Sequence, residues 1–159
     1  MKLITMTMAL SLTVLLAAPV SAEVLAIVSD MDGTLANAGI GTGSLGTGSA
    51  AIEFDTDTKV LSWSITWSGL TGAPTAMHFH GPALPNQSAG VTVAVGVTGM
   101  PVVGNAVLTA SQESDLVSGL WYINLHSATS PGGEIRGNLM DPTVDAHSLS
   151  MGSIKALYR

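Results

Sequence analysis

The sequence predicts an all-β protein, an antiparallel β-sandwich or barrel with Greek-key connections and one short helix. Apolar and small polar residues alternate with period two through most of the chain. Turn signals containing Gly, Pro or Asp separate these segments at short intervals. Only 10% of the residues are charged, and Gly, Ser, Thr, Ala and Val replace the strong helix formers. Together these observations favour short strands over helices.

The expected strands follow this alternation in order along the chain. Val24 to Val28 and Ala51 to Phe54 form the early strands, and Asp55 to Thr58 joins the second of them to the next strand as a tight hairpin. The apolar positions of the later strands point to one side, which we expect to be the core. These positions are Leu61, Trp63, Ile65 and Trp67; Val91, Val93, Val95 and Val97; Trp121, Ile123 and Leu125; and Ile135, Gly137 and Leu139.

Loops and one helix connect the strands. Gly69–Pro74, Gly81–Gly90 and Ser130–Gly133 are expected loops with Gly or Pro at their bends. Ser111 to Gly119 predicts a short helix with Ser111 as its N-cap. Ala36 to Ser49 is rich in Gly, Thr and Ser, which predicts a mobile loop.

Three parts are expected along the chain: a signal peptide at residues 1–22, a β domain at 23–140 and a tail at 141–159. Lys2, the uncharged run from Ile4 to Val20 and the small residues ending at Ala22 are typical of a secretory signal peptide. We therefore expect a secreted or periplasmic protein cleaved near Ala22, with no membrane span. The chain has no cysteine, so its core must be stable without disulfides.

The charge of the chain argues against polyanionic partners. The formal net charge is −6, and only four basic residues follow Lys2, without a cluster. Nucleic acids and anionic membrane surfaces are therefore not expected to bind.

Three of the four histidines occur in two distant segments, Thr75–Ala83 and Asn124–Gly137. In strands, His78 and His80 would project together, opposite Met77 and Phe79. His126 would lie on the polar face of its own strand, and all three would share one surface if the two strands were neighbours. Tyr122 and Asn124 flank His126 on that face and are candidates to contact and orient the ligand rings.

A His-x-His pair with one distant histidine suits copper or zinc, so His78, His80 and His126 are candidate ligands for a Cu or Zn ion. The alternative is that these histidines hydrogen-bond to loop backbone and shape the turn after His80. The fourth histidine, His147, lies in the tail and is expected to be solvated.

The two histidine segments resemble those of the CHRD family, the domain first described in chordin. The resemblance runs from about Val24 to Met140. Its carriers are TAMHFHGPA at residues 75–83, LWYINLH at 120–126 and PGGEIRGNL at 131–139. Where the family usually has a Glu-Val-Pro-Pro-like segment, this chain has DMDGTLAN at 30–37. The resemblance implies an immunoglobulin-like β-sandwich in an extracellular or periplasmic, non-catalytic binding module with a protein partner not yet identified.

Other chemistry finds little support in the sequence. His78-x-His80 is similar to a segment of copper/zinc superoxide dismutases, but the further His and Asp ligands of their dinuclear site are lacking. The DMDGT segment at 30–34 matches the first motif of haloacid-dehalogenase-type phosphatases without the β/α pattern that those enzymes need. Glu134 and Arg136 are expected to form a surface ion pair. We therefore expect a binding protein, either metal-binding or a metal-independent interaction or structural module, rather than an enzyme.

Overall fold

The computed structural model describes residues 24–139, which contain eight strands and one short helix. The predicted signal peptide at 1–22 and tail at 141–159 lie outside the described residues. The elements are β1 (Val24–Asp32), β2 (Thr47–Asp55), β3 (Val60–Ser68), β4 (Pro74–His80), β5 (Val91–Val95), β6 (Val102–Val107), α1 (Ala110–Val117), β7 (Trp121–Ser127) and β8 (Ile135–Leu139). The all-β prediction with one short helix is confirmed.

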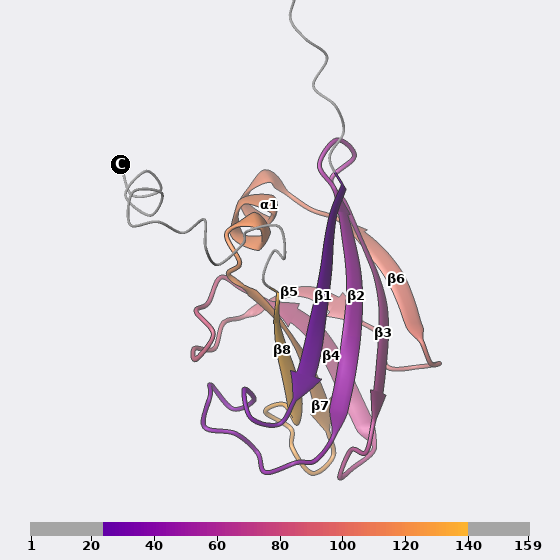
Figure 1. Ribbon diagram of the computed structural model, residues 1–159, viewed down its shortest axis with the longest axis vertical. Helices are drawn as coiled ribbons and strands as arrows, with labels where there is room; N and C mark the ends of the chain where they lie inside the picture. The colour runs from indigo at the N-terminus through magenta and orange to yellow at the C-terminus, as the bar shows by residue number, and fades with distance from the viewer. Residues whose placement is uncertain (1–23, 140–159) are drawn as a thin grey trace, which may run out of the picture.

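All neighbouring strands are antiparallel and form one nearly closed, barrel-like sheet in the order β5-β4-β7-β8-β1-β2-β3-β6. A single residue pair, Asp32 with Arg136, joins β1 to β8. The sheet therefore has two four-stranded halves. In Figure 1, β1, β2 and β3 stand in front, and β4, β7 and β8 cross behind them. The Greek-key and immunoglobulin-like details stay predictions.

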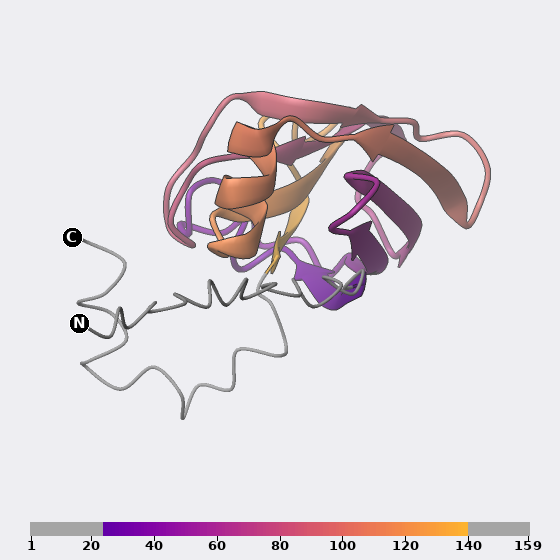
Figure 2. The same ribbon diagram turned by 90° about the horizontal axis from the view of Figure 1, so that it is seen from above.

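The core lies between these two halves. Figure 2 shows the sheet curving round its interior, with α1 beside it. Trp63 of β3 meets Phe79 of β4 edge to face, with ring centroids 5.4 Å apart, so the two halves pack directly on each other. Trp121 is buried with them, while Trp67 packs against the core and stays partly exposed. The alternation seen in the sequence thus selects most of the core correctly. Val91 is an exception, because it is 56% exposed, and Val97 lies beyond the end of β5 and is only partly buried.

Strand β6 was not predicted from the sequence, and the helix begins earlier than predicted. Gly104 interrupts the apolar pattern of β6, but a Cβ at this position would lie 2.7 Å from Cζ2 of Trp63. The glycine is therefore needed for the Trp63 ring to pack over the strand. The helix begins at Ala110, and its N-cap is Thr109 rather than Ser111, with a reciprocal capping box to Gln112.

The predicted loop at Ala36–Ser49 is shorter than expected and is hydrogen-bonded to the rest of the domain. Its last three residues, 47–49, belong to β2. The preceding segment is bonded to the body of the protein: Thr42 donates through Oγ1 to the carbonyl of Glu134 at 2.9 Å, and Ser44 Oγ donates to the Glu134 carboxylate at 2.7 Å. Polar residues that suggest disorder in the sequence serve here as hydrogen-bond donors.

Candidate metal centre

The two histidine-bearing strands, β4 and β7, are direct neighbours in the sheet. Their register pairs His80 with Tyr122, His78 with Asn124 and Ala76 with His126. Met77 and Phe79 are fully buried on the core side, so His78 and His80 project from the opposite face. The spatial condition on which the metal hypothesis depended is therefore met.

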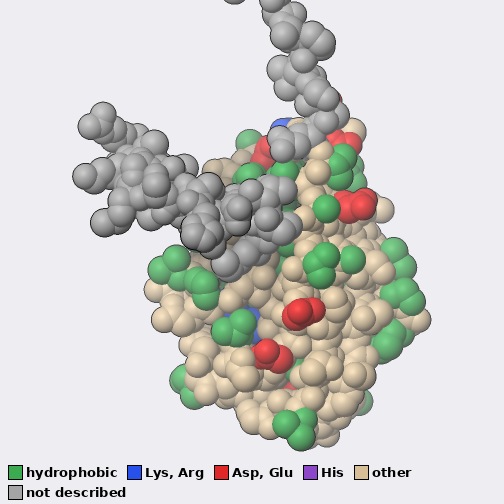
Figure 3. All heavy atoms as spheres, in the orientation of Figure 1, with side chains coloured by type: hydrophobic (Ala, Val, Ile, Leu, Met, Phe, Trp, Pro, Cys, Tyr) green, Lys and Arg blue, Asp and Glu red, His purple; other side chains and the backbone are tan. Residues whose placement is uncertain are grey.

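The three imidazoles gather into one group, the histidine cluster (His78, His80 and His126). Ring centroids are 5.2 Å apart for His78–His126, 5.5 Å for His78–His80 and 6.0 Å for His80–His126. Nδ1 of His78 lies 3.3 Å from Nε2 of His126. No purple histidine side chain appears among the coloured atoms in Figure 3.

Backbone carbonyls orient two of the three rings. His80 Nδ1 lies 3.1 Å from the carbonyl oxygen of Ala89, and His126 Nδ1 lies 2.8 Å from that of Pro131. A carbonyl oxygen only accepts, so each Nδ1 carries the proton and each Nε2 keeps a lone pair. The lone pair on His80 Nε2 is buried and has no hydrogen-bond partner within the described part of the chain. The expected backbone bond is thus present for His80, whereas His78 bonds to His126 instead.

The surroundings of His78 and His80 favour the uncharged form of these two rings. Burial lowers the pKa of His78, and the nearby His126 lowers it further. Burial also lowers the pKa of His80, with smaller contributions in the same direction from His78 and His126 that oppose the bond to Ala89. Neutral imidazole is the form that ligates a metal, so protons compete weakly at these two rings near neutral pH.

The geometry can accept one ion after a small adjustment. One nitrogen from each ring lies within 4.8 Å of the others. Bonds of about 2.0–2.1 Å to one ion require nitrogens roughly 3.3–3.6 Å apart, so the most widely separated pair must close by up to about 1.2–1.5 Å. His78 and His126 are already at that spacing. The other nitrogens would approach by rotation of the histidine side chains, because strand pairing fixes the backbone positions of β4 and β7.

Tyr122 and Asn124 occupy different parts of the surroundings. The Tyr122 ring stacks on His80 with centroids 4.8 Å apart and planes 5° apart, and its hydroxyl bonds to the backbone of Ala89. Tyr122 therefore supports both His80 and the carbonyl that orients it. The Asn124 amide donates to the carbonyl of Gly132, so this side chain supports the loop that carries Pro131.

Glu134 and Arg136 do not form the expected surface ion pair; both side chains are buried. Glu134 accepts hydrogen bonds from Ser44 Oγ and, at 2.6 Å, from the backbone N–H of Thr71. The Arg136 guanidinium carbon lies 3.4 Å from the centre of the Tyr122 ring. Period-two alternation placed both residues on a polar face, but loops cover that face. The sequence carries no signal for the Arg136–Tyr122 contact beyond the presence of an aromatic residue in a neighbouring strand.

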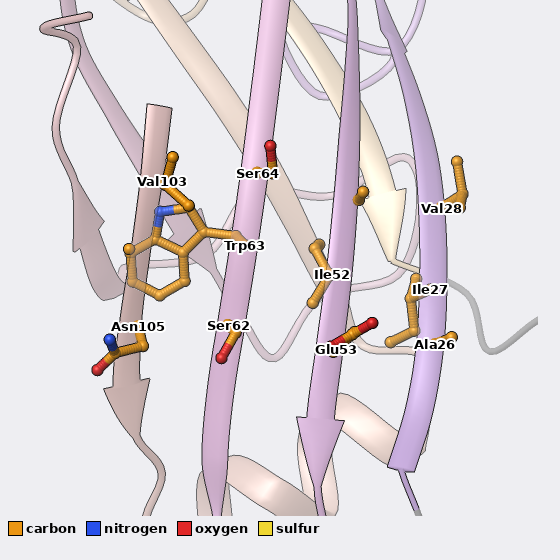
Figure 4. Close-up of a pocket in the computed structure, with 12 residues that line it drawn as sticks. Ala26, Ile27, Val28, Ile52, Glu53, Ser62, Trp63, Ser64, Val103 and Asn105 are labelled. Atoms are coloured by element: carbon orange, nitrogen blue, oxygen red, sulfur yellow. The ribbon is translucent and has the colours of Figure 1, made fainter. Parts of the chain in front are cut away.

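A separate hollow of about 690 Å³ lies over β1, β2, β3 and β6. Figure 4 shows Trp63 lying across β6 there, with Glu53 as the one charged side chain of the lining. Exposed Val28 and Val103 border it. This lining contains few polar groups that could direct a ligand, so the hollow offers less specific chemistry than the histidine cluster.

The DMDGT segment ends a strand, as expected for a chance match. Asp32 closes β1, and its Oδ1 accepts hydrogen bonds from the backbone N–H and hydroxyl of Thr34 at 2.7 and 2.6 Å. Such bonds stabilise a turn and occupy one oxygen of the carboxylate. The described residues contain no parallel β/α unit around it.

Comparisons with known proteins agree with the histidine segments. The CHRD domain family matches residues 28–139, a range that includes all three clustered histidines. No match was found among curated proteins or solved structures. No helix within residues 24–139 is long and apolar enough to cross a bilayer. The family match covers well over half of the sequence, and the chain belongs to the CHRD domain family.

Proposed function

We propose that this chain is a secreted or periplasmic, non-catalytic CHRD-domain binding protein that binds one Cu or Zn ion through His78, His80 and His126. The observation that carries this proposal is the buried, unpartnered Nε2 of His80 within a group of three imidazoles. A buried nitrogen lone pair without a partner costs free energy, and a metal ion would satisfy it.

The donor set supports copper or zinc over harder ions. Three imidazole nitrogens suit both metals, whereas calcium and magnesium prefer oxygen ligands. Carbonyl acceptors behind His80 and His126 fix the tautomer that a ligand needs. The strands would position the ligands before the ion arrives, which lowers the cost of ordering them.

The proposed location rests on the signal-like features of residues 1–22. The proposed lack of catalysis is supported by membership of the CHRD domain family. A superoxide-dismutase-like copper enzyme is the enzymatic alternative, and a superoxide assay on copper-loaded protein distinguishes it. We expect no dismutation above free-copper controls.

Calorimetric titration of the purified protein with Cu²⁺ and with Zn²⁺ tests metal binding. We expect saturable binding near one ion per chain, and its loss in the variant that combines His78→Ala, His80→Ala and His126→Ala. His147→Ala is the matched control, because it removes the one histidine outside the cluster. Absence of saturable binding, or equal binding by the triple variant, would reject the proposal.

A metal-independent interaction module is the second candidate. It is favoured by exposed valines on the outer side of the other half-sheet, where Val28, Val103 and Val107 are 69%, 72% and 71% exposed. Exposed apolar side chains on a sheet are typical of interaction surfaces. This candidate predicts that the triple histidine variant keeps every binding property of the parent protein.

A further inference from the structure

Arg136 is buried on the far side of Tyr122 from the histidine cluster. In the sheet, β7 lies between β4 and β8, so His80 and Arg136 approach Tyr122 from opposite sides. The His80 ring stacks on Tyr122 at 4.8 Å, and the Arg136 guanidinium carbon lies 3.4 Å from the Tyr122 ring centre. The guanidinium carbon is therefore within about 8 Å of the centre of the His80 ring. Arg136 is only 2% exposed.

The positive charge of Arg136 is bonded to neutral groups. Its nitrogens donate to Asn138 Oδ1 at 3.1 Å and to the carbonyls of Gln87 and Leu84 at 2.7 and 3.4 Å. Within residues 24–139, the one ion pair joins Lys59 to Glu113.

Asp32 is the backbone partner of Arg136 across β1 and β8. Its carboxylate turns to Thr34 and stays partly exposed to solvent. Water and salt therefore screen the negative charge of Asp32 more strongly than the positive charge of the buried Arg136 guanidinium. The other buried charged side chain among the described residues is Glu134, whose Oε1 accepts hydrogen bonds from Ser44 and Thr71. Arg136 is the charged group in contact with Tyr122, the ring that stacks on His80.

We infer that Arg136 makes the histidine cluster select Cu⁺ over Zn²⁺ and Cu²⁺, an inference that rests on the proposed metal-binding function. Three neutral imidazoles bring no negative charge to compensate a divalent ion. A fixed positive charge nearby therefore penalises a divalent ion more than a monovalent one. With a separation of roughly 8–10 Å and an effective dielectric constant of about 20, one extra unit of charge on the ion changes its relative affinity roughly 10- to 30-fold.

The role of Arg136 is electrostatic and positional, because Tyr122 separates it from the ligands. Imidazole ligates copper in both oxidation states, so the ligand atoms alone do not choose between them. The preference for Cu⁺ comes from the positive charge of Arg136, on the other side of the Tyr122 ring. In a one-electron couple, a tenfold change in the relative affinity for Cu⁺ and Cu²⁺ corresponds to about 59 mV.

The test compares affinities for Cu⁺ and Zn²⁺ in charge-changing variants. Cu⁺ affinity is measured anaerobically with ascorbate and a chromophoric competing chelator, and Zn²⁺ affinity with a zinc indicator. We expect Arg136→Met to reduce the preference for Cu⁺ over Zn²⁺ by roughly 10- to 30-fold. Arg136→Lys retains the charge and should stay within about threefold of the parent protein. Lys59→Gln is the matched control, because it removes an exposed positive charge and should leave the preference unchanged.

Three outcomes overturn the inference while leaving metal binding intact. These are an unchanged preference in Arg136→Met, equal shifts in Arg136→Met and Arg136→Lys, or a comparable shift in Lys59→Gln. If Arg136→Met does not fold, the Asp32→Asn variant tests the inference instead. Removing this negative charge should move the preference toward Cu⁺ by roughly twofold or more. No shift, or the opposite shift, rejects the inference. Failure of the parent protein to bind either ion rejects the proposed function itself.

Discussion

Replacing Glu134 by Gln should weaken the fold, because this carboxylate connects three loops at one end of the sheet. Its Oε1 accepts from Ser44 Oγ and from the backbone N–H of Thr71, and its side chain is fully buried. Burial raises the pKa of Glu134, but hydrogen bonds from Ser127, Ser44 and Thr71 together outweigh it and lower the pKa below its ordinary value. The group is therefore ionised at neutral pH.

The expected loss follows from the two hydrogen bonds to Oε1. A hydrogen bond to a charged acceptor contributes roughly 1 kcal/mol more than one to a neutral acceptor. Two such bonds give a loss of about 2 kcal/mol in the free energy of unfolding at pH 7 for Glu134→Gln. For a domain of this size, that loss corresponds to a Tm lower by about 8 °C.

The pH dependence of the loss identifies its cause. Because the pKa of Glu134 is lower in the folded protein, its contribution is complete above the unfolded pKa, near 4.5, and disappears as the pH falls through the folded value. Urea unfolding at pH 7 and pH 3 should therefore show a difference between parent and Glu134→Gln that shrinks at the lower pH.

Glu53→Gln is the matched control, since Glu53 is exposed on the outer face of β2. It should change stability by less than about 0.5 kcal/mol at either pH. The reasoning fails if Glu134→Gln is as stable as Glu53→Gln at pH 7, or if its deficit is the same at pH 3.

The remaining predictions concern packing and capping. Gly104→Ala should cost about 1–3 kcal/mol, because the new Cβ would lie 2.7 Å from the Trp63 ring; Gly96→Ala, with open space around it, is the control in urea unfolding. Phe79→Ala should cost about 3–5 kcal/mol by opening the contact with Trp63, and loss of near-ultraviolet circular dichroism at lower urea would confirm it. Thr109→Ala removes the helix cap and should cost about 1 kcal/mol; an unchanged unfolding midpoint would contradict this role.

The alternation of apolar residues made the core and the polar face predictable. Met77 and Phe79 had to be buried together, so His78 and His80 had to share the other face, and the structure agrees. The same rule failed for Arg136, because alternation tells which side of a sheet a residue occupies but not whether a loop covers that side.

The missed strand β6 and the segment before β2 show the same limit. Gly104 weakens the strand pattern of β6 in the sequence. The Trp63 ring on the neighbouring strand β3 nevertheless requires a glycine at this position. Thr42 and Ser44 suggest a solvated loop by composition, yet Glu134 gives both a buried partner. Each partner lies dozens of residues away in the chain, where short-range patterns carry no information about it.

The sequence by itself determined the all-β class, the core-facing residues and the common face of His78 and His80, because these depend on the two-residue period of a strand. The tertiary structure alone decided that β4 and β7 are neighbours and that His126 therefore joins the other two. The tertiary structure also decided that Tyr122 stacks on His80 and that Arg136 contacts the Tyr122 ring. Strand order arises from packing between distant segments, which no local pattern specifies, and both the proposed site and its proposed selectivity depend on that order.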